Sequence, residues 1–145
     1  QPAIDPFSYR DGRFVPPARA IVKQGWTLGV PDWKSLSGGK RQRFNTLDIL
    51  SATAPGAELS LDFEGTAIGA FVLAGPDAGT VEASIDDAKP IPVDIYHAYS
   101  KGLHYPRTVM FADNLASGKH RLVLKVAPHS TSTGNAIRIM QFTAN

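Results

Sequence analysis

Residues 63–86 read FEGTAIGAFVLAGPDAGTVEASID, and this stretch decides the fold class. Its middle, residues 67–74, carries no charged or strongly polar side chain and has glycines close by on both sides. A run of only eight residues is short for a helix and predicts a β-strand buried on both faces. After a turn at 75–79, apolar Val81, Ala83 and Ile85 alternate with polar residues, which predicts a neighbouring strand with one buried face. The organising element is therefore a sheet.

Composition sets the broad class of the protein. The 145 residues are 43% hydrophobic and 19% charged, as in a globular domain rather than a disordered segment. No apolar run approaches the ~18 residues that cross a bilayer, so no membrane partner is expected. A net charge of +2 is too small to indicate a nucleic-acid partner. The lack of cysteine excludes disulfides, thiolate metal ligands and cysteine nucleophiles.

The rest of the chain continues the β pattern. Residues 1–20 are rich in proline and are interpreted as a linker or N-terminal extension, followed by a single domain at 21–145. Strand-like segments recur about every 8–12 residues without a convincing helix, which predicts an all-β, antiparallel two-sheet sandwich of the jelly-roll type. A closed barrel stays open as an alternative. The segments predicted as strands are 18–26, 44–54, 58–63, 67–74, 81–85, 91–95, 108–112, 120–126 and 136–142, with a loop at 27–40.

The same alternation predicts the core between the two sheets. Its members are apolar residues that share the inward face of their strands. They are Leu61, Phe63, Ile68, Val72, Val81, Ile85, Leu122, Leu124 and Ile139.

The motifs of common enzymes are missing. The sequence has no Gly-x-Ser-x-Gly or Gly-Asp-Ser segment to supply a nucleophilic serine. Asp86 and Asp87 are better interpreted as a turn than as a catalytic pair, because neighbouring residues of a strand point to opposite faces. His97 and His104 lack the spacing of a zinc site. We expect a protein that is not an enzyme and has no certain cofactor. A structural calcium ion stays open, because its loop ligands leave little trace in a sequence.

Two clusters of aromatic and charged residues remain as candidates for binding. In the first, Trp33 stands among four cations, namely Lys34, Lys40, Arg41 and Arg43. It is either a stacking platform for an acidic partner or a core residue under a solvated loop. The second is the loop at 96–107, which contains three tyrosines, two histidines and two cations. Tyrosine and histidine offer flat faces and polar edges that suit a sugar, although Tyr96 and Tyr105 could instead simply close the sandwich end.

An up-and-down order of strands would bring the turns at 75–79, 96–107 and 128–134 to the same end. The Trp33 loop would then fall at the opposite end. Lys101 and Arg107 favour an acidic polysaccharide as the partner. The predicted ligand-binding residues are Asp77, His97, Tyr99, Lys101, His104, Tyr105, Arg107 and His129, with Trp33 as the member of the other cluster.

Several short segments occur in an order similar to that of a known family of domains. They are FEGTAIG (63–69), GPDAG (75–79), SID (84–86), KGLHYPR (101–107) and GKH (118–120), with YRDG (9–12) and GNAIRI (134–139) extending the pattern. Together they resemble the non-catalytic β-sandwich domain attached to bacterial SGNH (GDSL-type) esterases, a galactose-binding-like domain similar to carbohydrate-binding modules. The chain departs from the family at Tyr99, where tryptophan is expected, at Asp87, where a turn glycine is usual, and at Tyr105, where an aliphatic residue is usual.

The resemblance implies a carbohydrate-binding module, covalently linked to a catalytic domain in the full-length protein and secreted or periplasmic in a bacterium. The alternative is a structural accessory domain that packs on the esterase domain without a ligand of its own. A third hypothesis is a residual enzyme, such as a lyase that uses tyrosine and histidine as acid and base.

Overall fold

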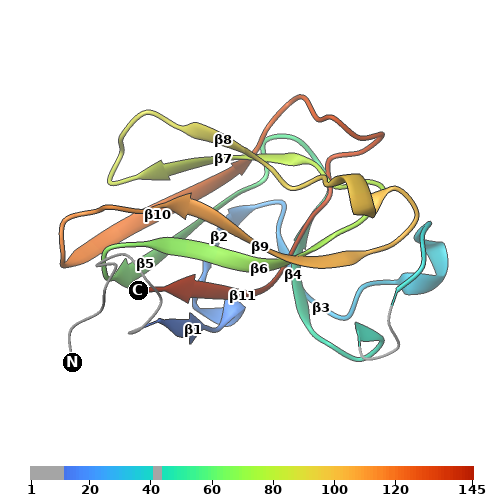
Figure 1. Cartoon of the computed structure of the whole chain (residues 1–145), viewed down its shortest axis with the longest axis horizontal. Coiled ribbons are helices and arrows are strands. Elements are labelled where there is room, and N and C mark those ends of the chain that lie inside the picture. Colours follow the sequence, from blue (N-terminus) through green and yellow to red (C-terminus); the bar gives the residue numbers. More distant parts are fainter. Residues whose placement is uncertain (1–11, 41–43) are drawn as a thin grey trace.

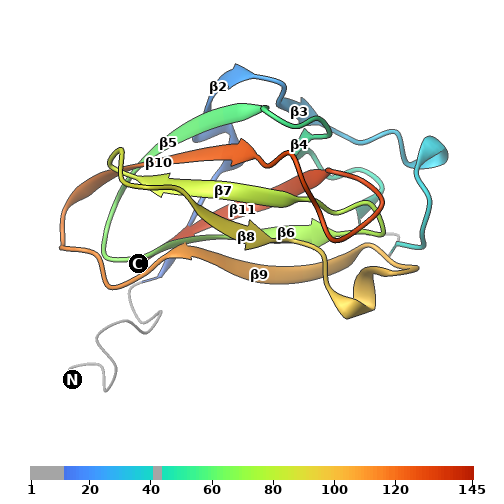
Figure 2. The same ribbon diagram turned by 90° about the horizontal axis from the view of Figure 1, so that it is seen from above.

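The computed structural model describes residues 12–40 and 44–145 and contains two antiparallel sheets packed face to face (Figure 1). The six-stranded sheet has the order β3 (Thr27–Gly29), β4 (Ile49–Ala52), β11 (Ile137–Ala144), β6 (Ile68–Ala74) and β9 (Tyr105–Ala112), and β1 (Arg13–Val15) also pairs with β11. The five-stranded sheet has the order β2 (Ile21–Gln24), β5 (Glu58–Glu64), β10 (Lys119–Val126), β7 (Thr80–Ile85) and β8 (Ile91–Asp94), seen from above in Figure 2. The predicted antiparallel sandwich is confirmed.

Helical structure is confined to short turns. Three 3₁₀ segments lie wholly within the described residues, namely η2 (Pro17–Arg19), η3 (Trp33–Ser35) and η5 (Ala98–Ser100). None of the helical segments in residues 12–40 and 44–145 has the length and apolarity of a membrane span.

β6 is buried on both faces, as its sequence predicts. Its inward residues, including Ile68 and Val72, pack in the main core between the sheets. Its outward Leu73 is also buried, in a second cluster with Phe44 and Met140. This second cluster exists because the long β3–β4 connection brings Phe44 onto the outer face of the six-stranded sheet.

The predicted up-and-down order of strands is wrong. Among consecutive strands, only β3–β4 and β7–β8 pair with each other, and most connections cross from one sheet to the other. Alternating apolar residues determine which face of a strand is buried, but they do not determine its partner. The same alternating pattern is compatible with a hairpin within one sheet and with a connection that crosses to the other sheet, about 10 Å away.

Strand boundaries differ most near the N-terminus. Residues 13–15 of the predicted extension form β1, while residues 1–11 lie outside the described residues. The strand predicted at 18–26 is shortened to β2, because Gly25 has a φ of +78° and turns the chain from β2 in one sheet to β3 in the other. β3 therefore lies inside the predicted loop. The strand predicted at 44–54 is limited to β4, and β9 begins three residues earlier than predicted, at Tyr105.

The predicted core is buried, with one exception. Leu61, Phe63, Ile68, Val72, Val81, Leu122, Leu124 and Ile139 all lie in the main cluster. Ile85 is half-buried at its edge, beside the turn at 86–90.

Removing a core side chain should destabilise the domain strongly. Leu61 is fully buried, so we expect Leu61→Ala to lower the free energy of unfolding by about 2–5 kcal/mol, through lost apolar contact and the cavity left behind. Ile91 is 61% exposed on an edge strand, and Ile91→Ala should change it by less than about 0.5 kcal/mol. Urea denaturation of both variants would measure the difference. Equal losses would contradict the assignment of these positions.

His120 joins the β7–β8 turn to the β9–β10 turn. Both turns lie at the end of the sandwich that carries the C-terminus, here called the terminal end. The His120 Nδ1 lies 2.5 Å from a carboxylate oxygen of Asp86, and its Nε2 lies 2.6 Å from the carbonyl oxygen of Ala116. Both neighbours accept hydrogen bonds, so the two contacts favour the imidazolium form of His120, in which both ring nitrogens carry protons. The Asp86 carboxylate also accepts from the backbone N–H of Arg121, which fixes a turn in which Asp86 and Asp87 both have positive φ.

This contact should make stability depend on pH. The hydrogen bonds of the His120 ring to Asp86 and to the Ala116 carbonyl raise the pKa of His120. The stabilisation is therefore complete below about pH 6.5 and is lost as the pH rises through the folded-state pKa. The same contact lowers the pKa of Asp86, so its contribution is present above about pH 4 and is lost in more acid solution. The stability difference between the parent and His120→Gln should peak between these values. Denaturation from pH 3 to 9, about the range over which both groups titrate, measures it, and a flat difference would contradict the protonated state.

Candidate ligand-binding site at the loop end

Four loops meet at the end of the sandwich opposite the terminal end, called the loop end and seen at the right in Figure 1. They are residues 30–40, 75–79, 95–104 and 127–136. The first and third loops are joined by a parallel bridge between Gly39 and Leu103, and the second and fourth by one between Ala78 and Ala136. The three turns predicted to lie together do lie at one end.

The Trp33 loop was predicted at the opposite end, and this is wrong. The Gly39 N–H donates to the Gly102 carbonyl at 2.9 Å, and the His104 N–H donates to the Gly39 carbonyl at 2.8 Å. The two clusters found in the sequence are thus parts of one surface. The β3–β4 connection is long and lacks apolar periodicity, so nothing in its pattern indicates the end at which it lies.

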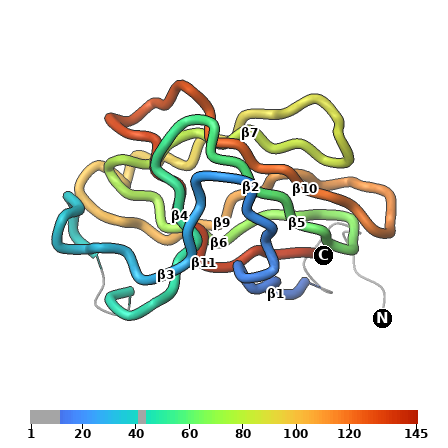
Figure 3. The backbone as a smooth tube through the Cα atoms, turned by 180° about the vertical axis from the view of Figure 1, so that it is seen from behind, coloured from blue at the N-terminus to red at the C-terminus, as the bar shows by residue number. Residues whose placement is uncertain are grey.

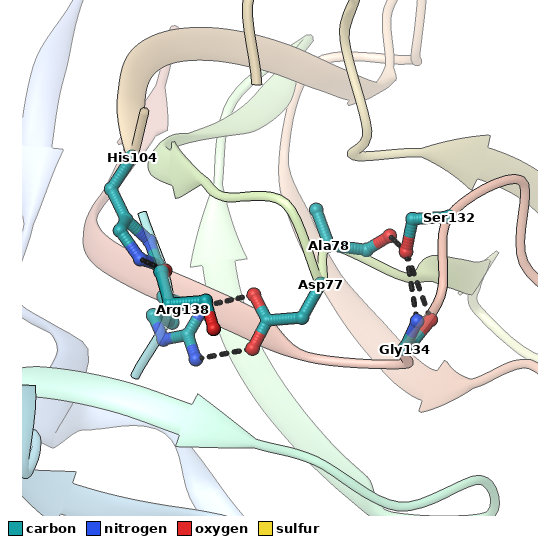
Figure 4. A network of polar contacts seen from close by, with 7 residues as sticks. Asp77, Ala78, His104, Ser132, Gly134 and Arg138 are labelled. Carbon is teal, nitrogen blue, oxygen red and sulfur yellow. Dashed lines mark hydrogen bonds and ion pairs between the residues drawn. The ribbon is translucent and has the colours of Figure 1, made fainter. Parts of the chain in front are cut away.

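A buried ion pair anchors the loop end. Arg138 of β11 has a side chain only 3% exposed, and its two terminal nitrogens donate to the two Asp77 carboxylate oxygens at 2.7 and 2.8 Å (Figure 4). Burial alone would raise the pKa of Asp77, but the hydrogen bonds and charge of Arg138 outweigh it and hold that pKa below its ordinary value. Both oxygens of this predicted ligand residue are therefore engaged in a structural contact.

The 127–136 loop packs directly on the Asp77 turn. A side chain at Gly134 would meet the Asp77 Cβ at 2.9 Å, so glycine allows the backbone to approach. The Ser132 hydroxyl donates to the Ala78 carbonyl at 2.7 Å and accepts from the Gly134 N–H at 3.1 Å (Figure 4).

His104, another predicted ligand residue, is buried. Its Nε2 lies 2.9 Å from the Ser37 carbonyl oxygen and must donate to it, while its Nδ1 has no hydrogen-bond partner in the described part of the chain. Burial lowers the pKa of His104, which is consistent with a neutral ring. Its Nδ1 packs so closely on Gly75 that a Cβ there would lie 2.3 Å away. The ring holds three loops together.

Trp33 is partly a packed residue under its loop and partly an exposed ring next to a cation, so it has features of both interpretations of its cluster. Its ring is half-buried, meets His104 edge to face at 5.0 Å between centroids, and donates its indole N–H to the Phe44 carbonyl at 3.2 Å. The Lys40 ammonium lies 5.2 Å from the ring centroid. Lys34 is exposed, whereas Arg41 and Arg43 lie outside the described residues.

Three rings form an aromatic cluster of His97, Tyr99 and Tyr105. Centroid distances are 5.0 Å for His97–Tyr99, 5.5 Å for Tyr99–Tyr105 and 5.9 Å for the nearly parallel His97–Tyr105 pair. His97 caps η5 by accepting from the Tyr99 N–H, and Tyr99 is presented to solvent with 67% exposure. The cluster offers an apolar surface with polar edges.

The loop that carries the cluster is fixed at its base. The Arg107 guanidinium donates to the carbonyls of Ile95 and Tyr96 at 3.2 and 3.4 Å. The Asp94 carboxylate accepts from the Tyr96 N–H at 3.0 Å and from the Thr131 hydroxyl at 2.8 Å, which ties the loop to its neighbour. Arg107 thus supports the loop rather than standing free.

Two predicted ligand residues, Lys101 and His129, are exposed on neighbouring loops. The sequence analysis missed Arg138, Asp94 and Ser132, which hold the loops in place. No group of three His, Asp or Glu side chains that could hold a metal is found among residues 12–40 and 44–145. The calcium ion stays a prediction.

Comparison with solved structures shows that the fold occurs as part of larger proteins. A two-domain esterase active on acetylated mannans, co-crystallised with mannopentaose, matches 92% of this chain with a TM-score of 0.64 and 12% identity. A family two carbohydrate esterase from Cellvibrio japonicus matches 92% with a TM-score of 0.57 and 17% identity. An exo-β-1,3-galactanase from Phanerochaete chrysosporium matches 91% with a TM-score of 0.58 and 17% identity.

The chain covers only 36%, 32% and 29% of these three proteins, about a third of their length. No protein-family model and no curated protein sequence matches it. The predicted resemblance to a β-sandwich domain of carbohydrate esterases is confirmed in its fold.

The buried ion pair should contribute more than an exposed one of similar geometry. Asp77→Ala leaves the Arg138 charge buried and unpaired, and because Asp77 is itself 35% exposed we expect a loss of about 2–3 kcal/mol, below the usual range for a fully buried pair. Asp62 forms a two-bond pair with Arg121 at 60% exposure, and Asp62→Ala should cost much less, because solvent screens the pair. Urea denaturation compares them, and a similar loss for both would contradict the anchoring role.

Proposed function

We propose that the protein is a non-catalytic carbohydrate-binding module that docks a saccharide on its aromatic cluster. The observation that carries this proposal is the 67% exposure of Tyr99, with the rings of His97 and Tyr105 within 6 Å of it. Aromatic faces suit the C–H faces of a sugar ring, and the Tyr and His edges suit its hydroxyl groups.

Rigidity of the loop supports this role. Arg107 and Asp94 fix the backbone before Tyr99, and the hydrogen bonds with Gly39 fix it afterwards, so little conformational freedom remains to be lost on binding. A surface that is ordered before the ligand arrives binds more tightly than a flexible one of the same composition.

Charge favours an acidic saccharide. Lys101 is exposed in the same loop as Tyr99, and Lys34 and Lys40 belong to the adjoining Trp33 loop. Two carboxylates of this loop end are occupied, Asp77 by Arg138 and Asp94 by Tyr96 and Thr131, while Asp32 of the Trp33 loop is exposed. The three lysines outnumber this one exposed carboxylate and would therefore attract an acidic polysaccharide.

Two of the loop histidines make contacts within the domain, and this favours a non-catalytic role over a lyase. His104 is buried against Ser37, and the His97 Nδ1 accepts from the Tyr99 N–H. The names of the matched proteins describe enzymes that act on carbohydrates, and this chain covers about a third of the length of each. We infer a covalently linked catalytic domain in the full-length protein, and a secreted or periplasmic location where polysaccharide is accessible.

A structural accessory role is the second candidate, because apolar side chains are exposed near the terminal end. Phe14 is 68% exposed and borders an apolar hollow of about 290 Å³ with Thr108 and Thr143. Such a surface is typical of a contact with a neighbouring domain.

The test is a glycan-array screen of the chain, followed by calorimetric titration with the best acidic glycan. Tyr99→Ala and Tyr105→Ala should each weaken binding by about 1–3 kcal/mol, by analogy with the stacking of bases on aromatic rings. Phe14→Ala is the matched control, since Phe14 is as exposed as Tyr99 but lies on β1, and it should leave the affinity unchanged.

Two outcomes would contradict the proposal. Parental affinity in both tyrosine variants would place the sugar elsewhere. Failure of every glycan on the array would favour the accessory role.

A further inference from the structure

A large hollow at the terminal end has no part in the proposed function. Its volume is about 840 Å³, within the range of about 300–1,000 Å³ typical of ligand pockets. β1, η2, β5, β10 and the turn at 86–87 surround it. Figure 3 shows β1 and the C-terminus together at this end, away from the loop end.

Two apolar residues, Val15 and Phe63, are among those that line the hollow, and Phe63 is largely buried, with 7% exposure. The His120 ring lies 5.5 Å from the Phe63 ring between centroids. His120 is held by Asp86 and Ala116, so this side of the hollow is fixed.

Part of the polar rim is fixed by contacts within the protein. The Arg121 guanidinium donates to the two carboxylate oxygens of Asp62 at 2.7 and 3.2 Å. Arg13 reaches from β1 to the Glu64 carbonyl oxygen of β5. These contacts bring β1, β5 and β10 together around the hollow before any ligand binds.

Four other rim side chains make no hydrogen bond or ion pair with the rest of the described chain. They are two cations, Arg19 and Lys119, and two carboxylates, Glu64 and Asp87. Arginine and lysine only donate hydrogen bonds, and carboxylates only accept them. A ligand that satisfies both kinds must donate and accept at several positions, as hydroxyl groups do.

The rim is close to electrically neutral. Its cations are Arg13, Arg19, Lys119, Arg121 and the protonated His120, and its anions are Asp62, Glu64, Asp86 and Asp87. A rim so balanced gives an anion little advantage over a neutral molecule.

We propose that this hollow is a second binding site, which takes a neutral saccharide by its hydroxyl groups. The module would then bind sugar at both ends, with an acidic chain on the aromatic cluster and a neutral one in the hollow. The second site does not depend on the first, because no rim residue belongs to the loop end.

The test is an NMR titration of the ¹⁵N-labelled chain with a panel of neutral oligosaccharides, namely mannopentaose, cellopentaose, xylopentaose and a β-1,3-linked galactotriose, at millimolar concentration. At least one should shift the backbone amides of residues 62–64, 86–87 and 119–121 in a saturable manner. Oligogalacturonate, an acidic probe, should shift them more weakly.

Variants then locate the site. Arg19→Ala and Asp87→Asn should each weaken neutral-sugar binding by about tenfold, the usual effect of losing one hydrogen bond to a charged group. Asn tolerates the positive φ of 64° at position 87, so that variant keeps the turn. Lys125→Ala, an exposed cation of β10 outside the hollow, should bind like the parent. Tyr99→Ala should also leave these shifts unchanged while it weakens binding at the loop end.

Three results would overturn the second site. One is a lack of saturable shifts at these amides with every neutral sugar in the panel. Another is preference for oligogalacturonate that disappears at high salt, which would mark an anion patch. The last is parental affinity in both Arg19→Ala and Asp87→Asn. Binding in the hollow without binding at Tyr99 would overturn the proposed function alone.

Discussion

The buried pair of Asp77 and Arg138 is the contact on which the loop end depends. Arg138 projects from β11 in the middle of the six-stranded sheet, where an unpaired charge would carry a large desolvation penalty. Asp77 relieves this penalty only if the 75–79 turn lies directly over β11. That position lets the Gly134 backbone approach and leaves Gly75 against the His104 ring. One electrostatic requirement therefore sets the positions of three loops.

The same organisation divides polar residues into two groups. Side chains that hold loops together, such as His104, Arg107 and Asp94, direct their polar atoms at backbone or side-chain partners within the domain. Side chains left facing solvent, such as Tyr99 and Lys101, are the ones available to a ligand. The rigid group makes the exposed group an ordered surface, which is the usual relation between a β-sandwich and its functional loops.

The sequence predicted which faces of the strands are buried, but it did not predict which distant segments lie together. The uncharged run in β6 and the alternation in β5 and β10 indicated buried faces correctly, because burial acts on each residue separately. Strand order and the place of the Trp33 loop depend on pairings between distant segments. Arg138 was overlooked because an arginine between two isoleucines fits an outward, solvated position of a strand. His104 was predicted as a ligand residue because nothing in its own segment shows that the Trp33 loop covers it.

Pairing of β1 with β11 has a consequence for how the domain forms. Arg13 lies opposite Ala144, so one edge of the six-stranded sheet joins segments separated by nearly the whole domain. Most of the other pairings also join strands that are not consecutive. Chains with such distant pairings fold slowly, because the entropy cost of closing long loops comes before the stabilising contacts form. During synthesis the sandwich stays incomplete until β11 has left the ribosome, and until then the apolar faces of β5 and β6 lack their full cover and are prone to aggregation.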